Sequence, residues 1–222
     1  MSGKSPQLDN RLMLCAKFVR KGANLADIGT DHAYLPVWLC RNGICPRAVA
    51  ADINPEPLER GRKTVEEAGL SEVISLRLSD GLKQIKPEEA GDVVIAGMGG
   101  ELIAKIILGC DFSRGGGRHF ILQPMTKSEE LIRALYENGF EINAQDCCRA
   151  SGKCYTVLSV SYTGLTHTED ELFYYTGKLD ASLPLHREFL QNHIARLRKK
   201  ALGDEHYAVL AGKLTEFIKQ GN

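Results

Sequence analysis

The sequence lacks an excess of charge of either sign, since lysine and arginine total 28 and aspartate and glutamate also total 28. Any contact with a nucleic acid must therefore come from a local cluster of cations and not from a globally basic surface. The sequence also lacks an apolar run of the roughly 18–20 residues that a membrane span needs. Its first six residues contain no apolar core of a secretory signal. We therefore expect a cytoplasmic protein that does not associate with membranes.

The sequence contains no Cys-X-X-Cys pair. An odd number of cysteines without such spacing argues against a disulfide framework and against a zinc site, so we expect reduced thiols and no metal. The adjacent pair Cys147 and Cys148 is either a redox pair or apolar core filling, and core filling is the preferred interpretation. The seven cysteines are Cys15, Cys40, Cys45, Cys110, Cys147, Cys148 and Cys154.

Strand and helix patterns alternate through residues 1–163. Strand patterns lie at 24–28, 48–52, 73–78, 92–96 and 119–122, and two further strands at 140–146 and 154–162 flank a hairpin turn. The helical patterns lie at 9–20, 33–42, 55–68, 101–108 and 128–138, and Asp9 can cap the first. This alternation predicts an α/β fold with a mostly parallel, seven-stranded, Rossmann-like sheet that closes with an antiparallel hairpin.

The pattern changes near residue 164, and no strand signal follows. Two apolar stripes at helical spacing, 185–201 and 207–218, predict a helical hairpin with a coiled-coil-like seam, and a third helix is expected within 167–180. We therefore predict two domains, residues 1–163 and a C-terminal helical domain at 164–222.

Four polar turns follow successive strands of the predicted sheet. The carboxyl ends of parallel strands meet at one edge, where open α/β sheets bind ligands. These turns should therefore surround one extended ligand. The expected ligand-binding residues are Asp27, Gly29, Asp31, His32, Asp52, Ile53, Asn54, Asp80, Gly81, Leu82, Ala96, Gly97 and Met98.

The residue types favour a nucleoside without phosphates. Gly29 admits a ligand close to the backbone, and Asp52 is positioned to accept hydrogen bonds from ribose hydroxyls. Asp80 can accept from an adenine amine, with Gly81 and Leu82 along the ring, and Asp27 suits a cationic amino group. A nicotinamide or flavin site, the main alternative, expects G-x-G-x-x-G after the first strand. The second and third glycines are absent here.

Several of these residues have a purely structural alternative. Asp31 is also a good N-cap for the helix expected from residue 33, and a hydrogen bond at that helix start would explain His32. Met98 is as well suited to packing as to lining a pocket. Tyr34 is more typical of a core than of a base-stacking platform.

Five segments resemble the bacterial tRNA (adenine-N1)-methyltransferases that act on position 22 of tRNA. They are residues 8–12, 27–36, 96–100, 121–124 and 152–155, and the likeness covers about residues 8–162. The C-terminal part is similar to that family mainly in being helical. The resemblance implies a class I methyltransferase fold and S-adenosyl-L-methionine as cofactor. It also implies methyl transfer to N1 of adenosine 22 in tRNA, which gives 1-methyladenosine.

Neutral adenine carries an in-plane lone pair at N1, so alignment with the methyl donor should supply much of the acceleration. Under the resemblance, Asp31 and His32 lie closest to the reacting methyl group and are the expected catalytic residues. Gly99, Gln123 and Pro124, together with Gly97 and Met98, are expected around the target base. Gln123 is otherwise an ordinary polar residue at a strand end.

Two basic runs become phosphate contacts under the tRNA hypothesis. One is Arg196, Arg198, Lys199 and Lys200, and the other is Arg11, Lys17, Arg20 and Lys21. Such runs are otherwise solvated helix faces. Two alternative functions remain open from the residues: a methyltransferase for small molecules and a noncatalytic RNA-binding protein. The oligomeric state is also open, with a monomer slightly favoured.

Overall fold

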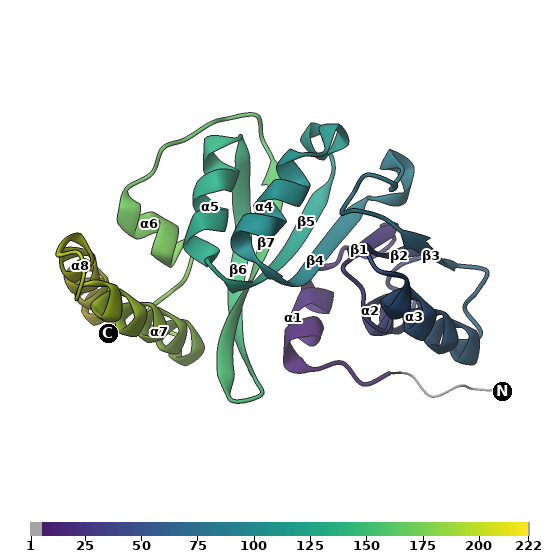
Figure 1. The fold of residues 1–222 in the computed structure, drawn as a ribbon, viewed down its shortest axis with the longest axis horizontal. Coiled ribbons are helices and arrows are strands. Elements are labelled where there is room, and N and C mark those ends of the chain that lie inside the picture. The colour runs from purple at the N-terminus through teal and green to yellow at the C-terminus, as the bar shows by residue number, and fades with distance from the viewer. Residues whose placement is uncertain (1–5, 222) are drawn as a thin grey trace.

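The computed structural model of the protein describes residues 6–221 and contains one seven-stranded sheet with helices on both faces (Figure 1). The strands are β1 (Leu25–Ile28), β2 (Ala48–Asp52), β3 (Ile74–Leu78), β4 (Asp92–Gly99), β5 (His119–Thr126), β6 (Phe140–Ala150) and β7 (Lys153–Tyr162). The helices are α1 (Asn10–Phe18), α2 (Tyr34–Arg41), α3 (Pro55–Ala68), α4 (Gly100–Leu108), α5 (Ser128–Glu137), α6 (Glu171–Thr176), α7 (Pro184–Lys200) and α8 (His206–Gln220).

The strand order is β3-β2-β1-β4-β5-β7-β6. Strands β1 to β5 pair in parallel, whereas β7 pairs antiparallel with both β5 and β6. From β1 the chain first adds β2 and β3 on one side of the sheet, and then adds β4 and β5 on the other side. In such sheets the ligand crevice lies where the order switches, beyond the carboxyl ends of β1 and β4. The predicted α/β fold class is confirmed.

Alternate residues along each strand supply two separate cores, as the two-residue period of a strand requires. In β1, for example, Ala26 and Ile28 pack with α4 and α5, whereas Leu25 packs with α1, α2 and α3. Because both faces are covered, the central strands are mostly apolar. Their buried polar side chains are few, and they include Asp27 in β1, Asp92 in β4 and Gln123 in β5.

Strands β4 and β5 extend beyond the expected ends at residues 96 and 122. The pairing continues through register shifts between Ala96 and Met98 and again between Met98 and Gly99. Gly97 makes this irregularity possible, because its φ of 83° lies in the left-handed region that favours glycine. A sequence pattern of apolar residues ends too early to predict such a bulged extension.

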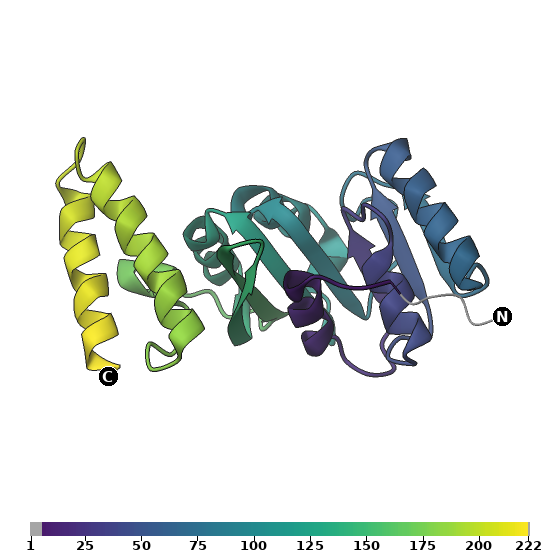
Figure 2. The same ribbon diagram turned by 90° about the horizontal axis from the view of Figure 1, so that it is seen from below.

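Helices α7 and α8 lie side by side at one end of the molecule, at the opposite end from α3 (Figures 1 and 2). Their shared core contains Leu190, Leu197, Leu210 and Leu214, and it reaches β6 and β7 through Cys147 and Cys154. The two expected apolar stripes therefore do form one helical hairpin. The third helix, α6, is shorter than the expected range, because the Asp170 carboxylate caps its start and Gly177 follows its end.

The redox interpretation of Cys147 and Cys148 is wrong for that pair. Successive side chains of a strand point to opposite faces, and accordingly Cys147 packs with the C-terminal helices and Cys148 with the α1 side of the sheet. The Cys147 thiol instead makes a hydrogen bond with Cys154 on the neighbouring strand. All seven cysteines are free thiols.

Within residues 6–221, none of the helices combines the length and the apolar character that a membrane crossing requires. Nor do three or more histidine, cysteine or acidic side chains come together as metal ligands within that range.

Candidate active site

A hollow of about 520 Å³ opens at the carboxyl edge of the sheet, beyond β1 and β4. The turn after β1, the end of β4 and the segment leading into α1 form its walls. The hollow is lined by Gln7, Asp9, Arg11, Leu12, Asp27, Gly29, Thr30, Asp31, His32, Ala33, Tyr34, Leu35, Ala96 and Gly97. The sequence prediction that the turns after β1 and β4 meet at one site therefore agrees with the geometry.

Gly29 begins the turn after β1 with a φ of 79°, and its N–H donates to the carbonyl of Ala51 at 2.8 Å. A Cβ atom at this position would lie 2.1 Å from Cε of Met98. A side chain at position 29 would thus meet both strain and a clash, whereas glycine leaves the backbone open to a close neighbour. Met98 packs over this turn and against the core, so it combines the two roles considered for it.

Asp27 is a buried carboxylate at the base of the hollow, with 6% of its surface exposed. Burial and, to a smaller extent, the neighbouring Asp52 raise the pKa of Asp27, a hydrogen bond from the Thr30 hydroxyl lowers it, and the net pKa is about 6. No cation in residues 6–221 forms an ion pair with it. A buried acid without a cation fits a ligand that brings a positive group, as S-adenosyl-L-methionine does.

Asp31 stands at the mouth of the hollow and is largely exposed. The Arg60 guanidinium of α3 donates to its Oδ1 from Nε at 3.1 Å and also from Nη2. The ring of His32 has Nε2 3.6 Å from Asp31 Oδ2 and stacks on Tyr34 with centroids 4.9 Å apart. Asp31 and His32 thus place an exposed carboxylate and an aromatic ring beside the turn that follows β1.

The N-cap interpretation of Asp31 is wrong. Helix α2 begins at Tyr34, and its N-cap is Ala33, which has a φ of 53° and makes no side-chain cap. The hydroxyl of Thr30 accepts the Ala33 N–H at 3.2 Å, so the start of the helix needs nothing from Asp31. The expectation that Tyr34 belongs to the core is also wrong, because 39% of its surface is exposed.

The turns after β2 and β3 lie outside this hollow. Asp52 accepts the Asn54 N–H at 2.7 Å, and Ile53 is 60% exposed. Asp80 pairs with Lys83 at 2.6 Å and lines a second hollow of about 570 Å³ together with the buried Leu82. The adjacent Gly81 has a φ of 59° and packs against Ile106. The four predicted turns thus share one sheet edge but not one cavity.

Gln123 is fully buried and joins three elements at the rear of the site. Its Oε1 accepts from the Gly97 N–H and from Nη1 of Arg11, each at 3.2 Å, and its Nε2 donates to the carbonyl of Pro124 at 2.9 Å. The buried amide therefore fixes the bulge of β4 against the end of β5. An ordinary strand-end residue would not be shielded in this way.

Two arginines reach the site from helices and not from the turns at the strand ends. Arg11 of α1 pairs with Asp9 and lies over the Tyr155 ring, 5.5 Å from its centroid. Arg60 of α3 holds Asp31, as described above. The sequence places Arg11 in the family-like segment 8–12 and in a basic run, but it does not indicate Arg60, because a contact between residues 29 positions apart leaves no local signal.

The two basic runs are not continuous patches. Arg196 faces a cleft beside β5 and β7, whereas Arg198 lines a different hollow with Thr215 and Lys219. The Lys200 ammonium lies 5.1 Å from the centroid of the Tyr207 ring. The four cations of α7 therefore project in several directions around the helix, as a 3.6-residue period requires.

The expectation that Arg20 contacts phosphate is wrong. Its Nε donates to Oδ1 of the fully buried Asp92 at 2.7 Å, and its Nη2 donates to the carbonyls of Gly91 and Gly117. Asp92 begins β4, so this network lies at the edge of the sheet opposite the hollow. Arg20 is occupied in holding the fold together.

The chain is similar to known proteins in both sequence and structure. Residues 8–158 match the family model described as Methyltransferase domain. The tRNA (adenine(22)-N(1))-methyltransferase of Bacillus subtilis is 38% identical over 152 residues, which are 68% of this chain and 64% of that protein. The chain thus spans less than two thirds of the length of the curated relatives it matches, at 64%, 43% and 62%.

Solved structures match over nearly the whole chain. A proposed tRNA (m1A22) methyltransferase of Streptococcus pneumoniae, in complex with S-adenosyl-L-methionine, has a TM-score of 0.83 and 32% identity and covers 97% of this chain and 99% of its own. The TrmK protein of M. capricolum, in complex with S-adenosyl-homocysteine, has a TM-score of 0.79 and 26% identity over 97% and 98% of the two chains. The match includes the helical C-terminal part.

Proposed function

The chain belongs to the family of bacterial tRNA (adenine-N1)-methyltransferases that act on position 22 of tRNA, and from this membership we propose that it has that activity. It transfers a methyl group from S-adenosyl-L-methionine to N1 of adenosine 22, in the cytoplasm. The observation that carries the proposal is Asp27, a buried acid that forms no ion pair within residues 6–221 and lies at the base of a hollow beyond β1 and β4. Related proteins described with S-adenosyl-L-methionine or its product share this fold.

When bound, S-adenosyl-L-methionine supplies a methyl group on a positively charged sulfur. Asp27 offers its carboxylate to the amino group of the methionine tail, and the open backbone at Gly29 admits that tail. Asp52 accepts hydrogen bonds from the ribose, with Ile53 and Asn54 beside it. Asp80, Gly81 and Leu82 face the adenine, while Ala96, Gly97 and Met98 close the site from β4.

Asp31 and His32 are the proposed catalytic pair. Methylation at N1 places a positive charge on the adenine ring, and a nearby carboxylate stabilises that charge as it develops. The exposed carboxylate of Asp31 is held in place by Arg60 and contacts His32, which can take a proton from N6 after transfer. Because N1 of adenine already carries a lone pair, the chain needs no base before the attack.

The target adenine is expected beside Gly97, Gly99, Gln123 and Pro124, where Gln123 fixes the shape of the wall. An adenine in a paired stem must first be swung out of its stack, at a cost of a few kcal/mol. We assign residues 1–163 to the methyltransferase domain and 164–222 to a helical domain that contacts tRNA phosphates. Its proposed contacts are Arg196, Arg198, Lys199 and Lys200.

The decisive experiment is mass spectrometry of nucleosides from unmodified tRNA incubated with the protein and S-adenosyl-L-methionine. We expect 1-methyladenosine in the wild-type reaction and a collapse of turnover in the Asp31→Ala variant. The same tRNA with guanosine at position 22 is the control and should give no product. RNA binding without methylation would favour a noncatalytic protein, and methylation of small molecules alone would favour the other alternative.

A further inference from the structure

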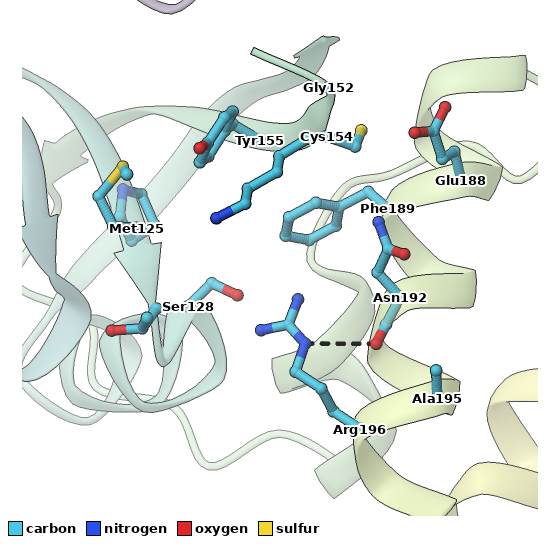
Figure 3. Close-up of a pocket in the computed structure, with 13 residues that line it drawn as sticks. Met125, Ser128, Gly152, Cys154, Tyr155, Glu188, Phe189, Asn192, Ala195 and Arg196 are labelled. Atoms are coloured by element: carbon cyan, nitrogen blue, oxygen red, sulfur yellow. Dashed lines mark hydrogen bonds between the residues drawn. The ribbon is translucent and has the colours of Figure 1, made fainter. Parts of the chain in front are cut away.

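A further cleft, separate from the two hollows at the carboxyl edge, lies between the sheet and α7. Arg11 separates it from the active-site hollow. Its volume is about 420 Å³, and its walls come from the end of β5, the β6–β7 hairpin and one face of α7. Figure 3 shows Phe189 and Arg196 extending from α7 toward the sheet side, where Met125 and Tyr155 lie, with Asn192 between them on the helix. The proposed function assigns Arg196 to tRNA phosphates but leaves the cleft itself without a role.

The chemistry of the cleft suits a nucleotide. Tyr155 offers aromatic surface on one wall, Phe189 contributes a small part of its ring to the opposite wall because it is only 5% exposed, and the exposed Asn192 offers an amide that can both donate to and accept from a base edge. Aromatic surface together with a polar amide is how proteins bind unpaired RNA bases.

The charges of the cleft suit a phosphate. Lys153 and Arg196 both line it, and within residues 6–221 neither is paired with a carboxylate. The Nε of Arg196 donates only to the carbonyl of Asn192, at 3.2 Å, which leaves the remaining guanidinium donors for a ligand. The acid in the wall, Glu188, is already engaged by Arg149. The cleft therefore carries an uncompensated positive charge.

The two cavities share a thin wall. Arg11 lines the active-site hollow, lies over the Tyr155 ring and donates to the sulfur of Met125 at 3.6 Å. Tyr155 and Met125 in turn line the cleft. A ligand in the cleft is thus separated from the active site by a single layer of side chains, which suits neighbouring nucleotides of one strand.

We propose that this cleft binds a second unpaired nucleotide of the RNA substrate, a neighbour in the strand of the adenine that is methylated. The base lies against the Tyr155 ring beside the Asn192 amide, and its phosphate contacts Lys153 and Arg196. The proposal rests on the proposed function, because it takes the substrate to be RNA. It gives the helical domain a specific task, since α7 supplies one wall of the cleft.

The first test fills the cleft. The Asn192→Trp variant should weaken binding of unmodified tRNA by at least about tenfold, the scale of one lost base stack, while the Kd of S-adenosyl-L-methionine stays unchanged. Val209→Trp, which adds the same bulk on α8 at a side chain that is 58% exposed, is the matched control. Equal tRNA affinity in the two variants would overturn the proposal.

The second test removes charge. The double variant Lys153→Ala/Arg196→Ala should lose tRNA affinity and salt dependence, whereas Lys178→Ala/Lys213→Ala removes the same charge from exposed positions outside the cleft. Equal losses in the two pairs would show a general charge effect and contradict a phosphate site in the cleft.

The third test locates the base. A single abasic site is placed in turn at each nucleotide next to the target adenine, one on the 5′ side and one on the 3′ side. Binding of each RNA is measured with the wild type and with Asn192→Trp. One abasic site should weaken binding to the wild type but add little in Asn192→Trp, because both changes remove one contact. Additive losses at every site would exclude a base in the cleft. Since these readouts are binding constants, they judge the cleft even if no 1-methyladenosine forms.

Discussion

At the scale of single residues, the buried Asp27 lowers the stability of the folded protein but favours the binding of a cationic ligand. Its carboxylate is buried beside Asp52 and has no cation in the described part of the chain, so the ionised form is unfavourable in the folded protein. The raised pKa measures that cost, since the unfolded chain ionises the same group freely. A cationic ligand would offset the cost on binding, which couples cofactor affinity to the charge on this one side chain.

The Asp27→Asn substitution should therefore stabilise the free protein and weaken its binding of S-adenosyl-L-methionine. Because the folded pKa of about 6 lies above the unfolded value, the wild type loses stability as pH rises through this range. Relative to the Asn variant, the loss between pH 4.5 and 7.5 should be about 2 kcal/mol. Urea unfolding at the two pH values and calorimetry of cofactor binding measure both effects. A variant that is less stable at pH 7.5 and binds normally would contradict this account.

Single residues also show which parts of the candidate site could be predicted from the sequence. Asp27, Asp31 and Gly97 follow predicted strands, and topology alone brings the ends of neighbouring parallel strands together. Arg11 and Arg60 come from helices, where nothing local indicates which distant group a long side chain will meet. Gln123 was identified at the correct strand end, but its burial depends on the extension of β5, which no apolar pattern shows.

At the scale of elements, α7 is attached to the rest of the fold through the buried His193. Its Nε2 lies 3.3 Å from Oγ of Ser128 at the start of α5, and its ring packs edge-on against Tyr175 and Phe189. Burial, with smaller effects from the charges of Arg196 and Lys200, lowers the pKa of His193 to about 3. The histidine is thus neutral in the folded protein and binds a proton near neutral pH only when α7 comes away.

The docking of α7 should accordingly weaken in acid. The folded pKa lies below the unfolded value, so stability is present above about pH 6.5 and is lost as pH falls toward 3. Between pH 7 and 5 the loss should be about 2 kcal/mol. His193→Leu should remove this part of the pH dependence, and His206→Leu, at an exposed site on α8, should retain it. Thermal unfolding across that range checks both, and parallel curves for His193→Leu and wild type would exclude the mechanism.

The network between α1 and β4 shows why a run of like charges is a poor guide to function. Burial raises the pKa of Asp92, but hydrogen bonds from His119 and from Arg20 outweigh burial and hold the pKa below its ordinary value. His119 also bonds Ser159 of β7 at 2.7 Å, so one buried acid connects α1, β4, β5 and β7. Nothing in the run of cations separates Arg20 from its neighbour Lys21, which is exposed.

Arg20→Met should therefore destabilise the protein by about 2–3 kcal/mol, because it leaves a buried carboxylate with fewer donors. Lys21→Met, at the exposed neighbouring position, is the matched control and should change the free energy of unfolding by less than about 0.5 kcal/mol. Urea unfolding at pH 7.5 measures both. Similar stabilities for the two variants would mean that the network contributes little, and that Arg20 is available for another role.

At the scale of the whole molecule, a net charge of zero conceals a separation of charge. Asp27 and Asp31 lie at the edge of the sheet that faces the proposed cofactor, whereas Lys153 and Arg196, which form no ion pair within residues 6–221, line the cleft beside α7. The cofactor carries a net positive charge and RNA a negative one, so each ligand meets the complementary end of the site. The same composition in a random arrangement would favour neither.

The directions of the cations on α7 determine how tRNA binding should respond to salt. Each phosphate contact contributes about 0.7–0.9 to the slope of log Kd against log salt. The variant Arg198→Ala/Lys199→Ala/Lys200→Ala should lower that slope by about 2, because it removes three of the proposed phosphate contacts. If tRNA approaches only from the cleft, Arg196→Ala alone should lower the slope, and the triple variant should match wild type. Filter binding from low to physiological salt separates these arrangements. Cofactor affinity should stay constant throughout, since none of these cations lines the active-site hollow.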